Sequence, residues 1–260
     1  DQGGLVRRRA RAEEPRLRRA LVREALQPAY LLHRRPYRES SQLLELLTAE
    51  HGRVGAVARG LRRRSRGGSP GALLQPFSPL LVGLAGRGEL KTLAGVETGG
   101  GLTPLRGDAL LSGLYVNELL VRLLHRDDPQ PGIFASYATV LGALADGEAI
   151  EPALRRFECE LLAALGYAFA FDRDARAGVP VAAASRYQFE PGVGLCAQRP
   201  GAGGTAFAGA DLLRAAAGDF TGSAGKAAKG VLRSALGELL GERPLRSRQL
   251  FLRRRERQDG

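Results

Sequence analysis

The stretch that decides the fold is QLLELLTAEHGRVGAVARG, residues 42–60. Two apolar runs, at 42–48 and 54–58, flank a turn at His51-Gly52, and the second run ends at Gly60. Short apolar runs separated by a glycine turn are typical of a β-hairpin. The leucine-rich first run is also compatible with a helix, because periodicity alone does not separate a short buried strand from a short helix.

Further apolar runs extend this hairpin on both sides. One run, at 29–33, precedes it, and two more, at 79–84 and 89–93, flank a Gly-Arg-Gly turn and indicate a second hairpin. Five short strands with glycine turns match the strand number of an OB-fold. We therefore expect an α+β protein whose residues 26–100 form a five-stranded OB-fold barrel.

Beyond the three glycines at 99–101, apolar residues recur at helical spacing. The sequence predicts an all-α domain over residues 101–260, and Asp108 is expected to cap its first helix. Residues 172–205 lose the helical period and are expected to form an irregular insertion, and a basic tail follows at 253–255. The predicted helices span 108–123, 133–144, 152–165, 211–217 and 224–240.

Most of the excess positive charge lies in the first quarter of the chain. Residues 1–66 carry 17 Arg against seven Asp or Glu, a net of +10, whereas the whole chain carries +12. Such a concentration favours a polyanion partner, since guanidinium groups match phosphate oxygens. The alternative is a basic face that only aids solubility. Residues 1–25 are expected to be a basic, disordered extension.

The barrel region supplies the candidate DNA-binding residues. Tyr37 stands among three arginines, a combination that suits a single strand because the cations follow the backbone while a ring stacks on a base. The alternative, that Tyr37 closes the barrel mouth, stays open. The candidates are Arg34, Arg35, Tyr37, Arg38, Arg53, Arg59, Arg62, Arg63, Arg64, Arg66 and Lys91.

The sequence offers little for catalysis or metal binding. Its two cysteines are too few for a disulfide scaffold or a four-ligand zinc site, and its three histidines are widely spaced. Asp127-Asp128 is interpreted as a helix-terminus feature, and no apolar run is long enough for a membrane span. We expect a cytoplasmic, nucleoid-associated protein that is not an enzyme, with no cofactor, no metal and no membrane partner.

Several motifs together resemble the RecO family of bacterial recombination mediators, in order from about residue 26 to 253. They are HRRPYRESS (33–41), GRV (52–54), LQPFSPL (74–80), GRGEL (86–90), YVNELL (115–120), LRRFE (154–158) and PLRSRQL (244–250).

The resemblance implies a role in the RecFOR pathway of DNA repair. It implies binding of single- and double-stranded DNA, annealing of complementary strands, and help in loading RecA onto strands coated with single-strand binding protein. Implied partners are RecR, the C-terminal tail of single-strand binding protein and, indirectly, RecA. An RNA- or ribosome-associated OB-fold protein is the alternative. A nuclease is disfavoured, because this sequence lacks the acidic cluster that would bind a catalytic metal.

The resemblance also bears on two sites in the helical half. Some family members carry a four-cysteine zinc module in the insertion, but here the insertion holds Cys196 alone, so we expect a degenerate, zinc-less version. The tail of single-strand binding protein is expected on the helix at 152–165. There Arg155 and Arg156 are predicted to flank an apolar face, unless they are solvated or pair with neighbouring glutamates.

Overall fold

The computed structural model describes residues 26–39, 41–59, 70–86, 88–101, 104–147, 149–199, 201 and 203–258. The chain forms two compact units. The barrel unit is Asp1–Thr103 with His125–Pro131, and the helical unit is Pro104–Leu124 with Gly132–Gly260. The predicted extension at 1–25 and the basic loop at 61–68 lie outside the described residues.

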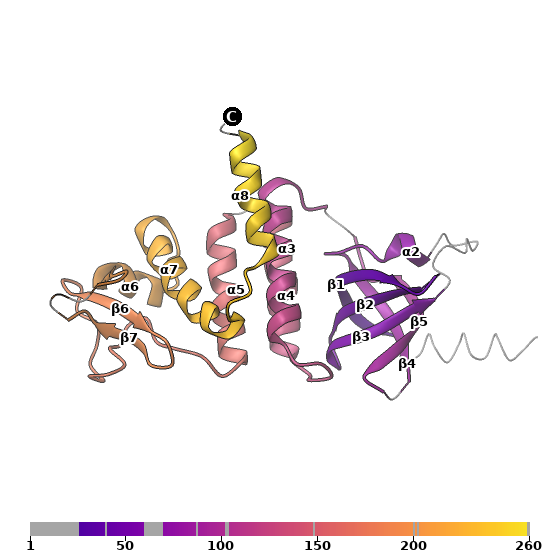
Figure 1. Cartoon of the computed structure of the whole chain (residues 1–260), viewed down its shortest axis with the longest axis horizontal. Coiled ribbons are helices and arrows are strands. Elements are labelled where there is room, and N and C mark those ends of the chain that lie inside the picture. The colour runs from indigo at the N-terminus through magenta and orange to yellow at the C-terminus, as the bar shows by residue number, and fades with distance from the viewer. Residues whose placement is uncertain are drawn as a thin grey trace, which may run out of the picture. The chain divides into compact units, whose positions relative to one another are not determined.

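Five strands close into a barrel in the order β1-β2-β3-β5-β4 (Figure 1). They are β1 (Gln27–Tyr37), β2 (Ser41–Thr48), β3 (Gly52–Arg59), β4 (Pro79–Ala85) and β5 (Leu90–Thr98), and a short helix, α2 (Pro70–Leu73), precedes β4. The predicted OB-type barrel is confirmed. The leucine-rich run is strand β2, with both of its faces buried, and a strand buried on both faces has no alternation to reveal it.

The barrel interior is aliphatic. Its core contains Leu31 of β1, Leu44 and Leu46 of β2, and Val82 of β4. The pairing of β1 with β2 shifts between Leu31 and His33, as at a β-bulge. A bulge changes which side chains of the bulged strand face inward, so Leu31 and Leu32 are both buried although they are neighbours.

The helical unit contains the predicted helices and one more. They are α3 (Gly107–Leu123), α4 (Pro131–Ala145), α5 (Ile150–Ala164), α6 (Gly209–Ala216), α7 (Gly222–Leu240) and α8 (Arg246–Gln258). The expected basic tail at 253–255 is part of α8. The prediction that Asp108 caps α3 is wrong: Arg106 is the N-cap residue, and Asp108 lies in the first turn and pairs with Arg254.

The insertion is more regular than its sequence indicates. It holds a small antiparallel sheet in the order β7-β6-β8, formed by β6 (Arg186–Glu190), β7 (Gly194–Ala197) and β8 (Phe207–Ala208). Figure 1 shows β6 and β7 beside α6 and α7. Strands of two to five residues are too short to show the alternation by which a strand is recognised in sequence.

Two adjacent polar residues of α3 tie the helical unit together. Asn117 accepts a hydrogen bond from the buried Tyr137 hydroxyl at 2.6 Å, which links α3 to α4. The Glu118 carboxylate accepts hydrogen bonds from the backbone N–H groups of Arg246 and Ser247 at 2.9 and 2.8 Å. Glu118 therefore caps the N-terminus of α8 from another helix. Asn117 and Glu118, the two polar residues at the centre of the YVNELL motif, thus both have structural roles.

Candidate nucleic-acid interface

Four candidate residues gather where β1, β2 and β3 meet at one end of the barrel. Tyr37 pairs with Ser41, and Ser41 pairs with Arg59 on the next strand. Arg35 lies two residues before Tyr37, and alternate residues of a strand share a face. Arg35 and Arg59 are exposed on this face, and Arg38 follows in the turn. We call Arg35, Tyr37, Arg38 and Arg59 the hairpin cluster.

Within the hairpin cluster an arginine covers the aromatic ring. The Arg38 guanidinium lies 5.2 Å from the centroid of the Tyr37 ring, a cation–π distance. Arg38 adopts a left-handed backbone conformation, with φ of 54°. Tyr37 shares its face with Arg35 and not with Arg34, whose partner Leu44 is in the core. The register therefore places Tyr37 on the outer face, where its half-buried ring is accessible from solvent.

Arg34 is exposed but makes a defined contact. Its Nη1 donates a hydrogen bond to the backbone oxygen of Leu74 at 3.0 Å. Because the bulge puts Arg34 opposite Leu44, its stem lies on the core-facing side of β1. Arg34 thus connects β1 to the segment that follows α2, and it stands apart from the hairpin cluster.

Arg53 and Lys91 lie elsewhere and already have acidic partners. Arg53 Nε is 3.9 Å from Glu45 Oε2, and Lys91 Nζ is 3.3 Å from Asp127 Oδ1. Burial lowers the pKa of Arg53; the Glu45 carboxylate opposes this shift, and nearby Arg126 adds to it. The described candidates therefore divide into the hairpin cluster, Arg34 with its backbone contact, and two cations that already pair with carboxylates. Arg62, Arg63, Arg64 and Arg66 lie outside the described residues.

The acidic partner of Lys91 belongs to a segment that the sequence did not connect to the barrel. Residues His125–Pro131, which we call the strap, follow α3 in the chain but pack in the barrel unit. The strap residue Arg126 pairs with Glu45 of β2. The interpretation of Asp127-Asp128 as a helix-terminus feature is therefore incomplete, because Asp127 contacts β5.

Arg155 and Arg156 of α5 have opposite environments. Arg155 is buried, at 4% exposure, and its Nη2 donates to Glu158 Oε1 at 2.7 Å. The same Glu158 oxygen accepts from the Tyr115 hydroxyl at 2.6 Å. The expectation that Arg155 flanks the apolar face at a solvent rim is wrong, since its charge is used against Glu158. Arg156 is exposed, as predicted.

This buried network shifts the pKa values of its members. Burial raises the pKa of Glu158, against the opposing effects of Arg155 and Tyr115. Burial and the Glu158 carboxylate raise the pKa of Tyr115 well above its ordinary value. Burial also raises the pKa of the neighbouring Cys159 to about 12. A thiol with this pKa is protonated at neutral pH and is a poor nucleophile.

In the insertion, the Asp174 carboxylate joins its own loop to the end of strand β7. Asp174 Oδ1 accepts hydrogen bonds from the N–H groups of Arg176 and Ala177, and Oδ2 accepts from Ala197 at 2.9 Å. Among the described residues, no three His, Cys, Asp or Glu side chains come close enough to hold a metal. The donor set of the insertion therefore does not fit a four-cysteine zinc module.

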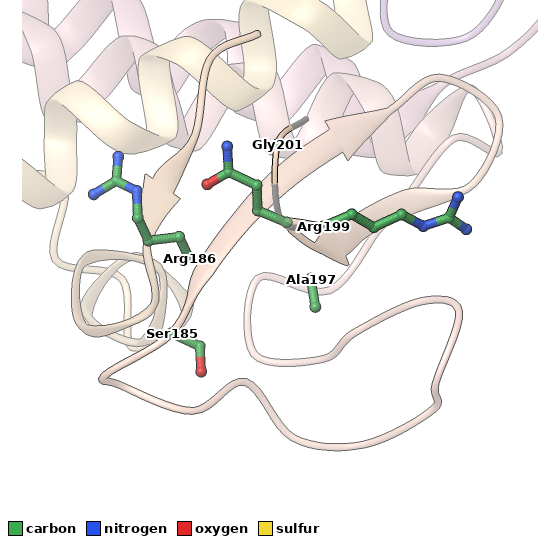
Figure 2. Close-up of a pocket in the computed structure, with 6 residues that line it drawn as sticks. Ser185, Arg186, Ala197, Arg199 and Gly201 are labelled. Atoms are coloured by element: carbon green, nitrogen blue, oxygen red, sulfur yellow. The ribbon is translucent and has the colours of Figure 1, made fainter. Parts of the chain in front are cut away.

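A shallow cavity of about 380 Å³ opens at the edge of the small sheet (Figure 2). Ser185, Arg186 and Arg199 line it, together with Ala197, Gln198 and Gly201. The Arg186 guanidinium donates to the backbone oxygen of Ala206, and Figure 2 shows the Arg186 and Arg199 side chains extending in different directions. Because the two guanidinium groups do not converge, we do not assign an anion site to this cavity.

No helix within the described ranges is long and apolar enough to cross a membrane.

Two family models match this chain, one over the barrel unit and one over the helical unit. Residues 22–100 match the sequence model of the family described as Recombination protein O N terminal, and residues 105–249 match Recombination protein O C terminal. The chain is 48% identical over 236 residues to the DNA repair protein RecO of Pseudomonas paraeruginosa, covering 89% of this chain and 97% of that protein.

More distant relatives carry the same name. The DNA repair protein RecO of Cellvibrio japonicus is 46% identical over 233 residues, covering 88% of this chain and 98% of that protein. The corresponding protein of Halorhodospira halophila is 45% identical over 231 residues, covering 86% and 95%. The chain therefore belongs to the RecO family of DNA repair and recombination proteins.

Proposed function

We propose that this chain is a non-catalytic recombination mediator that binds single- and double-stranded DNA through its barrel and anneals complementary strands. The observation that carries the proposal is the hairpin cluster, where exposed arginines surround a half-exposed tyrosine on the outer face of an OB-type barrel. OB-folds use this part of the barrel and its β1–β2 loop for oligonucleotides.

The chemistry of the cluster suits a single strand. Arg35 and Arg59 can contact successive phosphates, while Tyr37 can stack on a base and contribute about 1–3 kcal/mol. In the free chain Arg38 lies over this ring, so a base that stacks on the same face of Tyr37 displaces the Arg38 guanidinium, which can then contact a third phosphate. None of these contacts reads a base edge, so binding is expected to tolerate any sequence, as annealing requires.

The first test replaces Arg35, Arg38 and Arg59 with alanine. Each phosphate contact to a single strand contributes about 0.7 to the slope of log K against log salt, so the slope should fall by about 2. If the two proteins bind equally at 1 M salt, this difference in slope corresponds to roughly 100-fold weaker binding of labelled oligothymidine by the variant at 0.1 M salt. A control variant removes three exposed arginines of the helical unit, Arg106, Arg199 and Arg243, and should retain most of the affinity. Equal losses in both variants would contradict a role for the cluster.

A second test separates stacking from charge. Tyr37→Ala should lose the stacking contribution, whereas Tyr37→Phe keeps the ring and should bind within about twofold of the native chain. Annealing of complementary strands should follow the same order. Loss of binding in the phenylalanine variant would show that the hydroxyl, and not the ring face, is required.

The helical unit is the proposed site for the C-terminal tail of single-strand binding protein, and Arg156 is the exposed guanidinium that contacts it. Arg155 supports this site indirectly through its pairs with Glu158 and Glu151. Arg156→Ala should weaken binding of the tail peptide and annealing of coated strands while leaving annealing of bare strands intact. An equal loss of both annealing activities would contradict the assignment.

The remaining parts of the proposal follow from the family. We propose that the chain binds RecR and helps to load RecA onto strands coated with single-strand binding protein. The alternative, an RNA-associated OB-fold protein, predicts tighter binding to RNA than to DNA of the same sequence. Competition between the two strands in one assay distinguishes these functions.

A further inference from the structure

The strap is fitted to the outer face of the barrel by its backbone. The Asp127 N–H donates to the Arg53 oxygen at 2.9 Å, and Arg126 forms a parallel β-bridge with Arg53. Gly52 has φ of 65°, and a Cβ atom there would lie 1.8 Å from the backbone oxygen of Asp128. The absence of a side chain at Gly52 is therefore what lets the strap approach β3.

Two charged residues of the strap also form ion pairs with charged residues of the barrel. Arg126 of the strap pairs with Glu45, and the Asp127 carboxylate lies 3.3 Å from Lys91 Nζ. The Lys91 side chain is 15% exposed and that of Asp127 is 35% exposed, so solvent reaches the pair. Lys91 also donates to the backbone oxygen of Gly88 at 2.8 Å, which holds its ammonium at the β4–β5 turn.

This location matters because OB-folds bind oligonucleotides over strands 2 and 3, between the β1–β2 and β4–β5 loops. The strap contacts both β2 and β3, and Lys91 directly follows the β4–β5 turn. A carboxylate of the chain itself thus pairs with Lys91 on the face over which OB-folds bind oligonucleotides.

We propose that Asp127 masks a second phosphate-binding site, formed by Lys91 and Arg126, and that a bound single strand displaces the Asp127 carboxylate from Lys91. This proposal rests on the proposed DNA-binding function and extends its path beyond the hairpin cluster. The exchange replaces one partly exposed ion pair by another, and such pairs contribute little to stability. Arg126 remains on the surface, with its side chain 38% exposed, to contact the same strand.

The test compares two neighbouring substitutions that change the net charge equally. Asp127→Asn removes the carboxylate from Lys91, and asparagine tolerates the left-handed conformation of this position, where φ is 54°. Asp128→Asn is the matched control, because Asp128 accepts a hydrogen bond from Gln130 and not from Lys91. Each variant is made in the native chain and in a Lys91→Ala background, and binding to labelled oligothymidine is measured from 50 to 200 mM salt.

We expect Asp127→Asn to bind about threefold more tightly, with a salt slope steeper by up to about 0.7, the contribution of one phosphate contact. Asp128→Asn should have less than half of this effect, and Lys91→Ala should abolish the gain of Asp127→Asn.

Equal gains from Asp127→Asn and Asp128→Asn would overturn the proposal, because they would reflect net charge alone. A gain that persists in the Lys91→Ala background would overturn it as well. Either result would leave the hairpin cluster as the DNA site. Failure of the native chain to bind oligothymidine at 50 mM salt would instead overturn both this proposal and the proposed function.

Discussion

Replacing Arg155 with alanine should strongly destabilise the helical unit. The substitution removes the 2.7 Å hydrogen bond to Glu158, whose side chain is 2% exposed, and leaves the Tyr115 hydroxyl as its remaining side-chain donor in the network. Breaking a buried ion pair from one side typically costs about 3–5 kcal/mol, because the other charge stays buried without compensation. The Glu151 pair adds little, since that carboxylate is 53% exposed.

The size of this loss should depend on pH. Burial raises the pKa of Glu158 above its ordinary value, and removal of Arg155 raises it further. Between its unfolded and folded pKa values the folded state binds the extra proton, so this group's contribution falls as the pH rises. The deficit of Arg155→Ala should therefore be smaller at pH 5 than at pH 8.

Urea unfolding followed by circular dichroism measures the free energy of unfolding at both pH values. Arg156→Ala is the matched control and should cost less than about 0.5 kcal/mol, as is usual for exposed positions. Adding Glu158→Gln to Arg155→Ala removes the stranded charge and should recover part of the loss at pH 8. A cost below about 1 kcal/mol for Arg155→Ala at pH 8 would refute the reasoning that Arg155 compensates a buried carboxylate.

Three further predictions concern the helical unit: two of its carboxylates and its metal content. Burial alone would raise the pKa of Glu118, but the hydrogen bonds from Ser247 and Arg246 lower this pKa below its ordinary value. The stabilisation that the Glu118 carboxylate provides is therefore present above about pH 4.5 and declines as the pH falls. Glu118→Gln should cost about 1–2 kcal/mol at pH 7 by weakening the cap of α8, and thermal unfolding at pH 7 and pH 4 should show that the variant has lost part of this acid sensitivity. Asp174→Asn places an amide opposite a backbone donor and should lower stability by about 1–2 kcal/mol in urea unfolding, with no change expected for the exposed Asp172→Asn. The purified chain should carry no stoichiometric zinc and keep its melting temperature in chelator; one zinc per chain by elemental analysis would contradict this.

Local sequence patterns determined most of the secondary structure. The helices at α3, α4, α5 and α7 were predicted because their apolar residues recur every three or four positions. The barrel was predicted because glycine turns separate its short apolar runs and indicate five strands, whereas the order β1-β2-β3-β5-β4 came only from the structure. Helix α8 was missed because its anchor, Glu118, lies 128 residues before Arg246 and leaves no local pattern.

The site was predicted less completely, because residue type and neighbours do not determine what a charge meets in the folded chain. Arg35 and Arg53 are both arginines of predicted barrel strands and were equally good candidates. In the structure Arg35 is exposed in the hairpin cluster, while Arg53 lies beside Glu45 and the strap. Arg155 and Arg156 are adjacent, yet only Arg155 turns toward Tyr115 and Glu158.

The physical reason is the range of the interactions. Helix and strand patterns arise from neighbours a few residues apart, so composition and spacing reveal them. The strap reaches Glu45 through Arg126, across 81 residues, and the buried network joins Tyr115 to Glu158 across 43. The sequence alone therefore determined which residues are charged and where most of the helices and the barrel strands lie. Only tertiary packing decided which of those charges are available to a partner.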